Sequence, residues 1–188
     1  FEPVFIVAHY EVRPGAGAPK QRVFAGRGRV HIGDDLTIGG TRVSEEDREQ
    51  NFDLSGLDAA LNLGDFTLRG EWAETDSFTA GRGEGYRLHL SGKIDRVWQL
   101  DAIYRNLDDT YRNLSNQVGD PGEERFGLVL QGRPSDDTRY LASYTKRHNA
   151  LRGEESEGAS LEAVHNLEKD LSVSAGIEKL DRTLQAGV

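Results

Sequence analysis

Hydrophobic and polar residues alternate along much of the chain, and the alternation is clearest over residues 85–106. In the first half of this stretch Tyr86, Leu88 and Leu90 share one parity, whereas arginine, histidine, serine and lysine residues occupy the other. Successive side chains of a β-strand point to opposite faces, so a period of two predicts strands with one apolar and one polar face. A short turn at residues 95–96 separates the two strands of this stretch.

The same alternation predicts eleven strands along the chain. They are expected at residues 4–12, 22–32, 36–43, 52–63, 66–77, 86–94, 98–105, 126–133, 139–145, 160–169 and 171–177. Between Phe52 and Leu63 the apolar residues change parity, and a β-bulge near Ser55 would reconcile them. Residues 160–171 also fit an amphipathic helix, so strand and helix both remain open there. As a strand, this segment would turn His165 towards the apolar side.

Short and long connections alternate between the predicted strands. The short ones are expected at residues 33–35, 64–65, 95–96, 134–137 and 169–170, and the long ones at 13–21, 44–51, 78–84, 107–124 and 151–159. In an up-and-down antiparallel sheet this order places all short turns at one end and all long loops at the other. Bacterial transmembrane barrels have this asymmetry. The pattern therefore predicts an all-β, up-and-down antiparallel transmembrane β-barrel, with residues 1–188 forming one barrel domain or a fragment of a larger barrel.

Aromatic residues gather near the ends of the predicted strands, on the apolar parity. Amphipathic aromatic rings favour the headgroup level of a bilayer, where they form belts at both interfaces. The general preference of aromatic residues for strands explains their presence but not this placement. The expected membrane-belt residues are Trp72, Tyr86, Trp98, Tyr104, Phe126, Tyr140 and Tyr144.

The composition fits the same class of protein. Hydrophobic residues make up 36% of the chain and the mean hydropathy is −0.61, yet the apolar residues are spread evenly and form no core segments. No apolar run approaches the roughly 18 residues of a membrane-spanning helix, whereas a barrel strand needs only about 10 alternating residues. The absence of cysteine excludes disulfides and thiolate metal sites. A net charge of −9 argues against nucleic acid as a partner.

With these features the chain resembles the outer-membrane β-barrel proteins of Gram-negative bacteria. The segments VFIVAHYEV and TIGGTRVSEEDREQNFDLSGLDAALNLGDFTLRGEWAETDS look like strand-and-turn units of large porin-like or surface-exposed barrels. The resemblance implies a location in the bacterial outer membrane, in contact with outer-membrane lipid and lipopolysaccharide. Single-chain bacterial barrels have even strand numbers, so twelve or more strands, some of them beyond Val188, are expected in the full protein. The chain starts at Phe1 and contains no methionine, so we expect a processed or excised piece of a longer protein.

Basic residues are concentrated on the polar parity, which would face the lumen of a barrel. An arginine-rich wall around a water-filled passage favours anionic solutes. The alternative is a lumen plugged by cross-strand salt bridges, as in small barrels. The expected pore-lining residues are Arg27, Arg29, Arg69, Glu71, Arg87, Lys93, Asp101, Arg105, Arg133 and Arg139.

Other chemistry has weaker support in the sequence. Residues 44–51, 108–124 and 151–159 together account for the net charge, and we expect them to be solvated loops because no calcium-loop spacing is present. His89 and Ser91 share the polar parity and could form a nucleophile–base pair with an acid, but they would lie in the middle of the lumen. The sequence therefore predicts no catalytic residue, metal site or cofactor.

Three functions remain open on this basis. The first is an outer-membrane barrel that passes or binds small polar solutes, anions among them, or that serves as a surface-exposed structural protein. The second is a soluble all-β binding module, in which the apolar face packs on another sheet. The third is an outer-membrane hydrolase, which the sequence supports least. The oligomeric state is open in all three.

Overall fold

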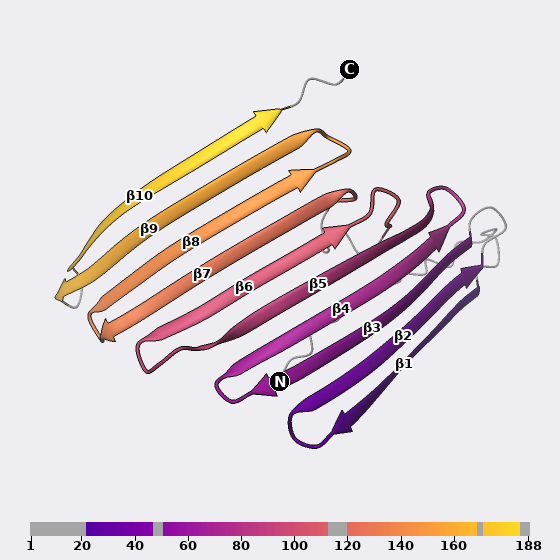
Figure 1. Ribbon diagram of the computed structural model, residues 1–188, viewed down its shortest axis with the longest axis horizontal. Coiled ribbons are helices and arrows are strands. Elements are labelled where there is room, and N and C mark those ends of the chain that lie inside the picture. Colours follow the sequence, from indigo (N-terminus) through magenta and orange to yellow (C-terminus); the bar gives the residue numbers. More distant parts are fainter. Residues whose placement is uncertain (1–21, 47–50, 113–119, 169–170, 185–188) are drawn as a thin grey trace, which may run out of the picture.

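The computed structural model describes residues 22–46, 51–112, 120–168 and 171–184, which form a single antiparallel sheet of ten strands (Figure 1). The strands follow one another in chain order, as in an up-and-down topology. They are β1 (Arg22–Ile32), β2 (Leu36–Glu46), β3 (Asn51–Leu63), β4 (Phe66–Ser77), β5 (Gly81–Lys93), β6 (Trp98–Leu107), β7 (Glu123–Ser135), β8 (Thr138–Asn149), β9 (Glu154–Glu168) and β10 (Leu171–Leu184). The all-β antiparallel prediction is thus confirmed, and the strand expected at 4–12 lies outside the described residues.

Ten of the predicted strands are present, and two details of the prediction are wrong. The first is the β-bulge near Ser55, because β3 pairs with β2 and with β4 in one uninterrupted register. Phe52 and Leu54 instead point to the opposite face from Leu57 and pack there against Val43. The helix considered for residues 160–171 is also absent, since β9 covers this segment up to Glu168. The apolar residues of β3 do change parity, but the cause is a small apolar cluster on the polar face and not a bulge.

The second detail is the strict alternation of long and short connections. The turns at residues 33–35, 64–65 and 136–137 are short as expected, but the opposite connections at 78–80 and 150–153 are short as well. Strands such as β5 and β9 extend into the segments predicted as loops, because backbone pairing with the neighbouring strand continues beyond the residues in which apolar and polar side chains alternate. Between described strands the connection at residues 108–122 is the longest, and parts of the acidic segments expected as loops, residues 44–46, 123–124 and 154–159, belong to strand ends.

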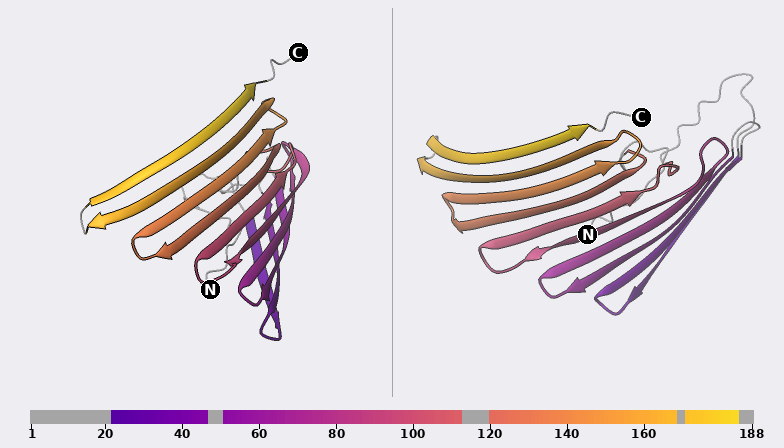
Figure 2. Two further views of the ribbon diagram at one scale, coloured as in Figure 1. Left: turned by 60° about the vertical axis from the view of Figure 1, so that its left-hand side comes forward. Right: turned by 45° about the horizontal axis from the view of Figure 1, so that its top comes forward.

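The sheet is twisted and curved but not closed (Figure 2). Within the described part of the chain, β1 pairs only with β2 and β10 pairs only with β9, so each has one unpaired edge. The register is continuous between most neighbours, and shifts occur only near the ends of the β7–β8 and β9–β10 pairs. Curvature of this kind brings side chains together on one face and spreads them apart on the other.

The two faces of the sheet differ in chemistry and in exposure. We call the face that carries Leu88 the apolar face and the face that carries Arg87 the polar face. Apart from Gly132, every strand residue that is buried lies on the polar face, whereas large hydrophobic side chains on the apolar face stay exposed, as for Leu88 at 48% and Ile177 at 72%. Among the described residues no second layer covers the apolar face. No helix in this part of the chain is long and apolar enough to cross a membrane.

Residues 108–112 fold back onto the polar face and are held there by several contacts. Tyr111 is buried against Ala73 and Leu107. The Arg112 amide donates to the Thr75 hydroxyl at 3.2 Å. Beneath this segment Gly83 leaves no room for a Cβ, which would collide with the backbone of Tyr111. A glycine is needed at this position so that the returning chain can approach the strand closely.

Candidate functional site

Four arginines lie side by side across the polar face, one on each of four neighbouring strands. Arg87 of β5 is the register partner of Arg105 of β6, which faces Arg125 of β7, which in turn faces Arg147 of β8. We call these four residues the arginine row. Neighbouring strands are about 4.8 Å apart, so the row extends over about 14 Å.

Two acids continue the row on the other side of Arg87. Glu71 of β4 is the register partner of Arg87, and Asp58 of β3 is the partner of Glu71. Asp58 is paired with Arg27 at 2.8 Å, and the Arg27 guanidinium also donates to Thr41 at 3.3 Å. One level of the polar face therefore carries negative charge on β3 and β4 and positive charge on β5 to β8.

Glu123 supplies the main counter-charge within the arginine row. Its carboxylate is 4% exposed, forms an ion pair with Arg105 and lies 3.0 Å from the Nε of Arg147. Arg147 also donates to Asp120 at 2.8 Å, where the long connection joins β7. A buried carboxylate between two guanidinium groups restrains both of them. Two alternate members of the row, Arg105 and Arg147, are thus held by the protein itself.

The other two members of the row have fewer protein contacts. Arg125 is exposed and forms no ion pair with any residue in the described part of the chain. Arg87 is partly buried and forms no ion pair with a described residue, although the Glu71 carboxylate on β4 attracts it electrostatically; its Nε has no hydrogen-bond partner among the same residues. Guanidinium groups present up to five donors each, so both side chains keep unused donors on a face that is already rich in positive charge.

The predicted pore-lining residues all lie on the polar face, but they do not form one site. Arg87 and Arg105 belong to the arginine row, and Glu71 of β4 and Arg29 of β1 lie at the same level of the sheet. Lys93, Arg133 and Arg139 lie near the opposite ends of their strands. That any of these ten residues lines a pore remains a prediction.

Sequence reasoning missed Asp58, Arg125 and Arg147. The strands around Arg125 and Arg147 were predicted to be too short, because their apolar alternation fades before the pairing ends. Parity alone would have placed all three residues on the polar face. Their alignment follows from the register between strands, which one sequence does not display.

His89 comes close to an acid but not to a nucleophile. Its Nε2 lies 2.8 Å from Asp101 on the neighbouring strand, and Ser91 is the register partner of Asp101. In the described part of the chain no hydrogen bond links the Ser91 hydroxyl to His89. A nucleophile–base contact is therefore not formed in this arrangement. The same residues contain no group of three or more potential metal ligands.

The expected belt residues all lie on the apolar face, in two sets. Tyr86 and Tyr104 have ring centroids 5.8 Å apart near one margin of the apolar region. Trp98 and Tyr140 stack at 6.3 Å near the other margin. The remaining belt residues, which lie on the same side as Tyr86, are Trp72, Phe126 and Tyr144. That these rings lie at a membrane interface remains a prediction.

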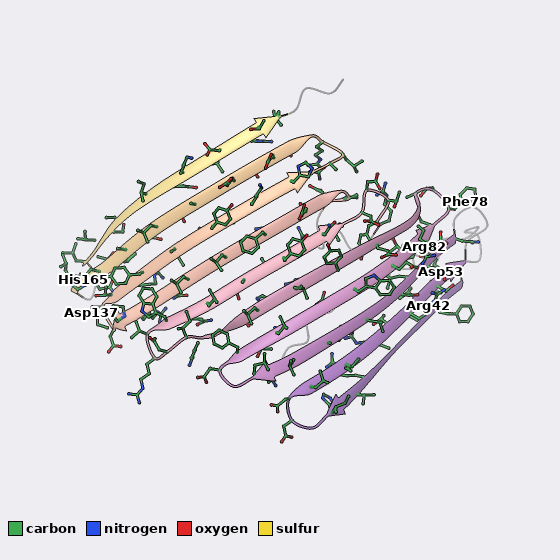
Figure 3. The ribbon with its side chains drawn as sticks, viewed as in Figure 1. Arg42, Asp53, Phe78, Arg82, Asp137 and His165 are labelled. Carbon is green, nitrogen blue, oxygen red and sulfur yellow. The ribbon has the colours of Figure 1, made fainter. Side chains whose placement is uncertain are left out.

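Beyond the first of these margins the apolar face becomes charged (Figure 3). Arg42 and Asp53 form an ion pair at 2.9 Å at this end of the strands, close to Arg82. Further along the sheet Glu155 lies 3.1 Å from the Lys146 ammonium, and hydrogen bonding to this carboxylate raises the pKa of Lys146. We call this set of strand ends the charged rim. Asp137 and His165 lie at the opposite end of the strands (Figure 3).

Comparison with protein-family models and with the sequences of curated proteins finds no match to this chain.

Proposed function

We propose that this chain forms part of a transmembrane β-barrel in the outer membrane of a Gram-negative bacterium. In this proposal the apolar face contacts lipid, and the polar face borders a water-filled lumen that passes or binds small polar solutes, anions among them. One observation carries the proposal: a wide apolar face, with aromatic residues at both margins, has no protein layer over it among the described residues. Soluble proteins rarely expose apolar patches larger than a few hundred Å².

The dimensions of the apolar face support the proposal. On β1 the apolar residues extend from Phe24 to Ile32, a distance of about 27 Å at a rise of about 3.4 Å per residue. A strand tilt of about 40° would reduce this length to a height of about 21 Å. The lipid-facing band of transmembrane barrels is about 25 Å tall. The charged rim would then lie in the headgroup region and in water.

Burial on the two faces is opposite to that of a soluble sandwich. A soluble sheet buries its apolar face against a second layer. Here the buried side chains, including those of Glu45, Thr75 and Glu123, lie on the polar face. A polar interior and an apolar exterior are the arrangement of a transmembrane barrel.

Among the described strands β1 and β10 each have one unpaired edge, and a complete barrel requires a partner for both edges. An unpaired strand edge in lipid leaves backbone groups without hydrogen bonds, at a cost of several kcal/mol for each group. We therefore propose that these edges pair with further strands of the same protein, or with each other, in the complete barrel. Additional strands would also leave the lumen wide enough for water.

The proposal is tested on the full-length protein, refolded into detergent micelles and into lipid vesicles. A transmembrane barrel should migrate faster in an SDS gel before boiling than after it, and should resist added protease once inserted into vesicles. Conductance in planar bilayers then distinguishes an open passage from a plugged lumen. A protein that stays monomeric and soluble without detergent, with the same gel mobility before and after boiling, would instead be the soluble binding module.

A further inference from the structure

The arginine row carries more positive charge than the neighbouring protein groups neutralise. Like charges directly opposite one another on neighbouring strands destabilise a sheet, and the row contains three such contacts in succession. Glu123 and Asp120 compensate Arg105 and Arg147, and Glu71 partly compensates Arg87 without forming an ion pair with it, which leaves Arg125 as the least compensated member of the row. An anion bound to Arg87 and Arg125 would reduce the electrostatic repulsion within the row.

We propose that Arg87 and Arg125 form a binding site for a small organic dianion, a dicarboxylate, with one carboxylate held by each guanidinium. The proposal deepens the proposed function and rests on it in one respect, namely that the polar face is open to water. Guanidinium groups bind carboxylates through two parallel hydrogen bonds, which makes arginine better suited than lysine to this role.

The spacing of the two arginines determines the number of acidic groups in the ligand. Arg87 and Arg125 are separated by β6, so their strands are two spacings or about 10 Å apart. Arg105 lies between them, and Glu123 already holds its guanidinium. A ligand with a single carboxylate can therefore satisfy one of the two outer arginines, whereas a ligand with two carboxylates joined by a short carbon chain can satisfy both.

Glu71 limits the site on one side and fixes its orientation. It lies opposite Arg87 on β4, with Asp58 directly beyond it. Arg27 already neutralises Asp58, so Glu71 is the group that would repel a second carboxylate, which would instead extend from Arg87 towards β7. The site is also open to solvent, because Arg125 is exposed and Arg87 is only partly buried.

The test measures binding by isothermal titration calorimetry to the full-length protein folded in detergent. The probes are succinate, glutarate, acetate and inorganic phosphate, at low ionic strength. We expect at least one dicarboxylate to bind about tenfold or more tightly than acetate and more tightly than phosphate. The variants Arg87→Gln and Arg125→Gln should each lose about tenfold in dicarboxylate affinity while acetate affinity changes little. Arg125→Lys, which keeps the charge but loses the paired donors, should lose part of the affinity.

Lys146→Gln is the matched control, because it removes one positive charge from the strand that carries Arg147 but on the opposite face. It should bind dicarboxylates like the wild type. Equal affinity for acetate and the dicarboxylates would overturn the proposal and indicate a general anionic preference of the lumen. Tighter binding of phosphate than of any dicarboxylate would overturn it in favour of a single-oxyanion site. An equal loss in Lys146→Gln would overturn it as well.

Gel mobility before and after boiling is measured on the same preparations, which keeps the two proposals separable. A heat-modifiable barrel without dicarboxylate binding would overturn the site and leave the barrel intact. A soluble protein that still binds dicarboxylates through Arg87 and Arg125 would overturn the barrel and support the site. If Arg87→Gln fails to fold, Arg125→Gln and Arg125→Lys still decide the outcome.

Discussion

The indole ring of Trp98 lies over Gly132, its register partner on the neighbouring strand. A Cβ on Gly132 would come within 2.5–2.8 Å of three atoms of the indole ring, so the ring occupies the space that a side chain would fill. The same ring stacks on Tyr140, which is the partner of Gly132 on its other side. The glycine thus allows an aromatic pair to span three strands at one margin of the apolar face.

Replacing Gly132 with alanine should displace the Trp98 ring and separate it from Tyr140. We expect a loss of about 1–3 kcal/mol in the free energy of unfolding, as for other overpacked sites, and a red shift of Trp98 fluorescence. Gly28→Ala is the control, because Gly28 lies on the same face and a Cβ added there would meet nothing within 4 Å. Equal stability of the two variants in urea titrations would contradict the proposed role of Gly132.

The strands could be predicted from the sequence because their signal is local. Apolar residues at every second position identified β1 and β4 to the residue. The predicted strands start too late in β7, at Phe126 instead of Glu123, and end too early in β8, at Thr145 instead of Asn149. Polar residues on both faces end the alternation there while hydrogen bonding continues. The arginine row was not predictable, since it depends on how four strands align. Sheet closure is a long-range property as well, and parity contains no information about it.

Replacing Glu123 with glutamine should destabilise the fold more than any exposed acid-to-amide change. The substitution leaves Arg105 and Arg147, both partly buried, without their shared counter-charge, and removing one partner of a buried ion pair costs about 3–5 kcal/mol. Glu155→Gln, which breaks the exposed pair with Lys146, should cost about 0–1 kcal/mol. Urea unfolding of both variants in the same detergent checks the difference. Equal midpoints would show that Glu123 does not neutralise the row.

The chain's two tryptophans lie near opposite margins of the apolar face, which makes them reporters of membrane depth. Trp72 donates its indole N–H to Glu84 at 3.3 Å, at the side of the charged rim. The variants Trp72→Phe and Trp98→Phe each leave one reporter in the protein. In vesicles, lipids brominated near the headgroup should quench both reporters more strongly than lipids brominated near the chain end. Stronger quenching by the deep label, or none, would argue against two interfacial belts.

Leu128 and Val129 are neighbours in β7 whose side chains point to opposite faces. The same substitution at each position therefore compares the environment of the apolar face with that of the polar face. In vesicles Leu128→Lys should lower the free energy of unfolding by about 2–4 kcal/mol, because a charge near the bilayer midplane must leave water. Val129→Lys should cost less than about 1 kcal/mol, since its side chain would enter an aqueous lumen. If the sheet instead exposed both faces to water, the two lysines would be tolerated equally. Urea unfolding from vesicles therefore measures the difference between the two environments directly, because the two variants have the same net charge and differ only in the face that carries it.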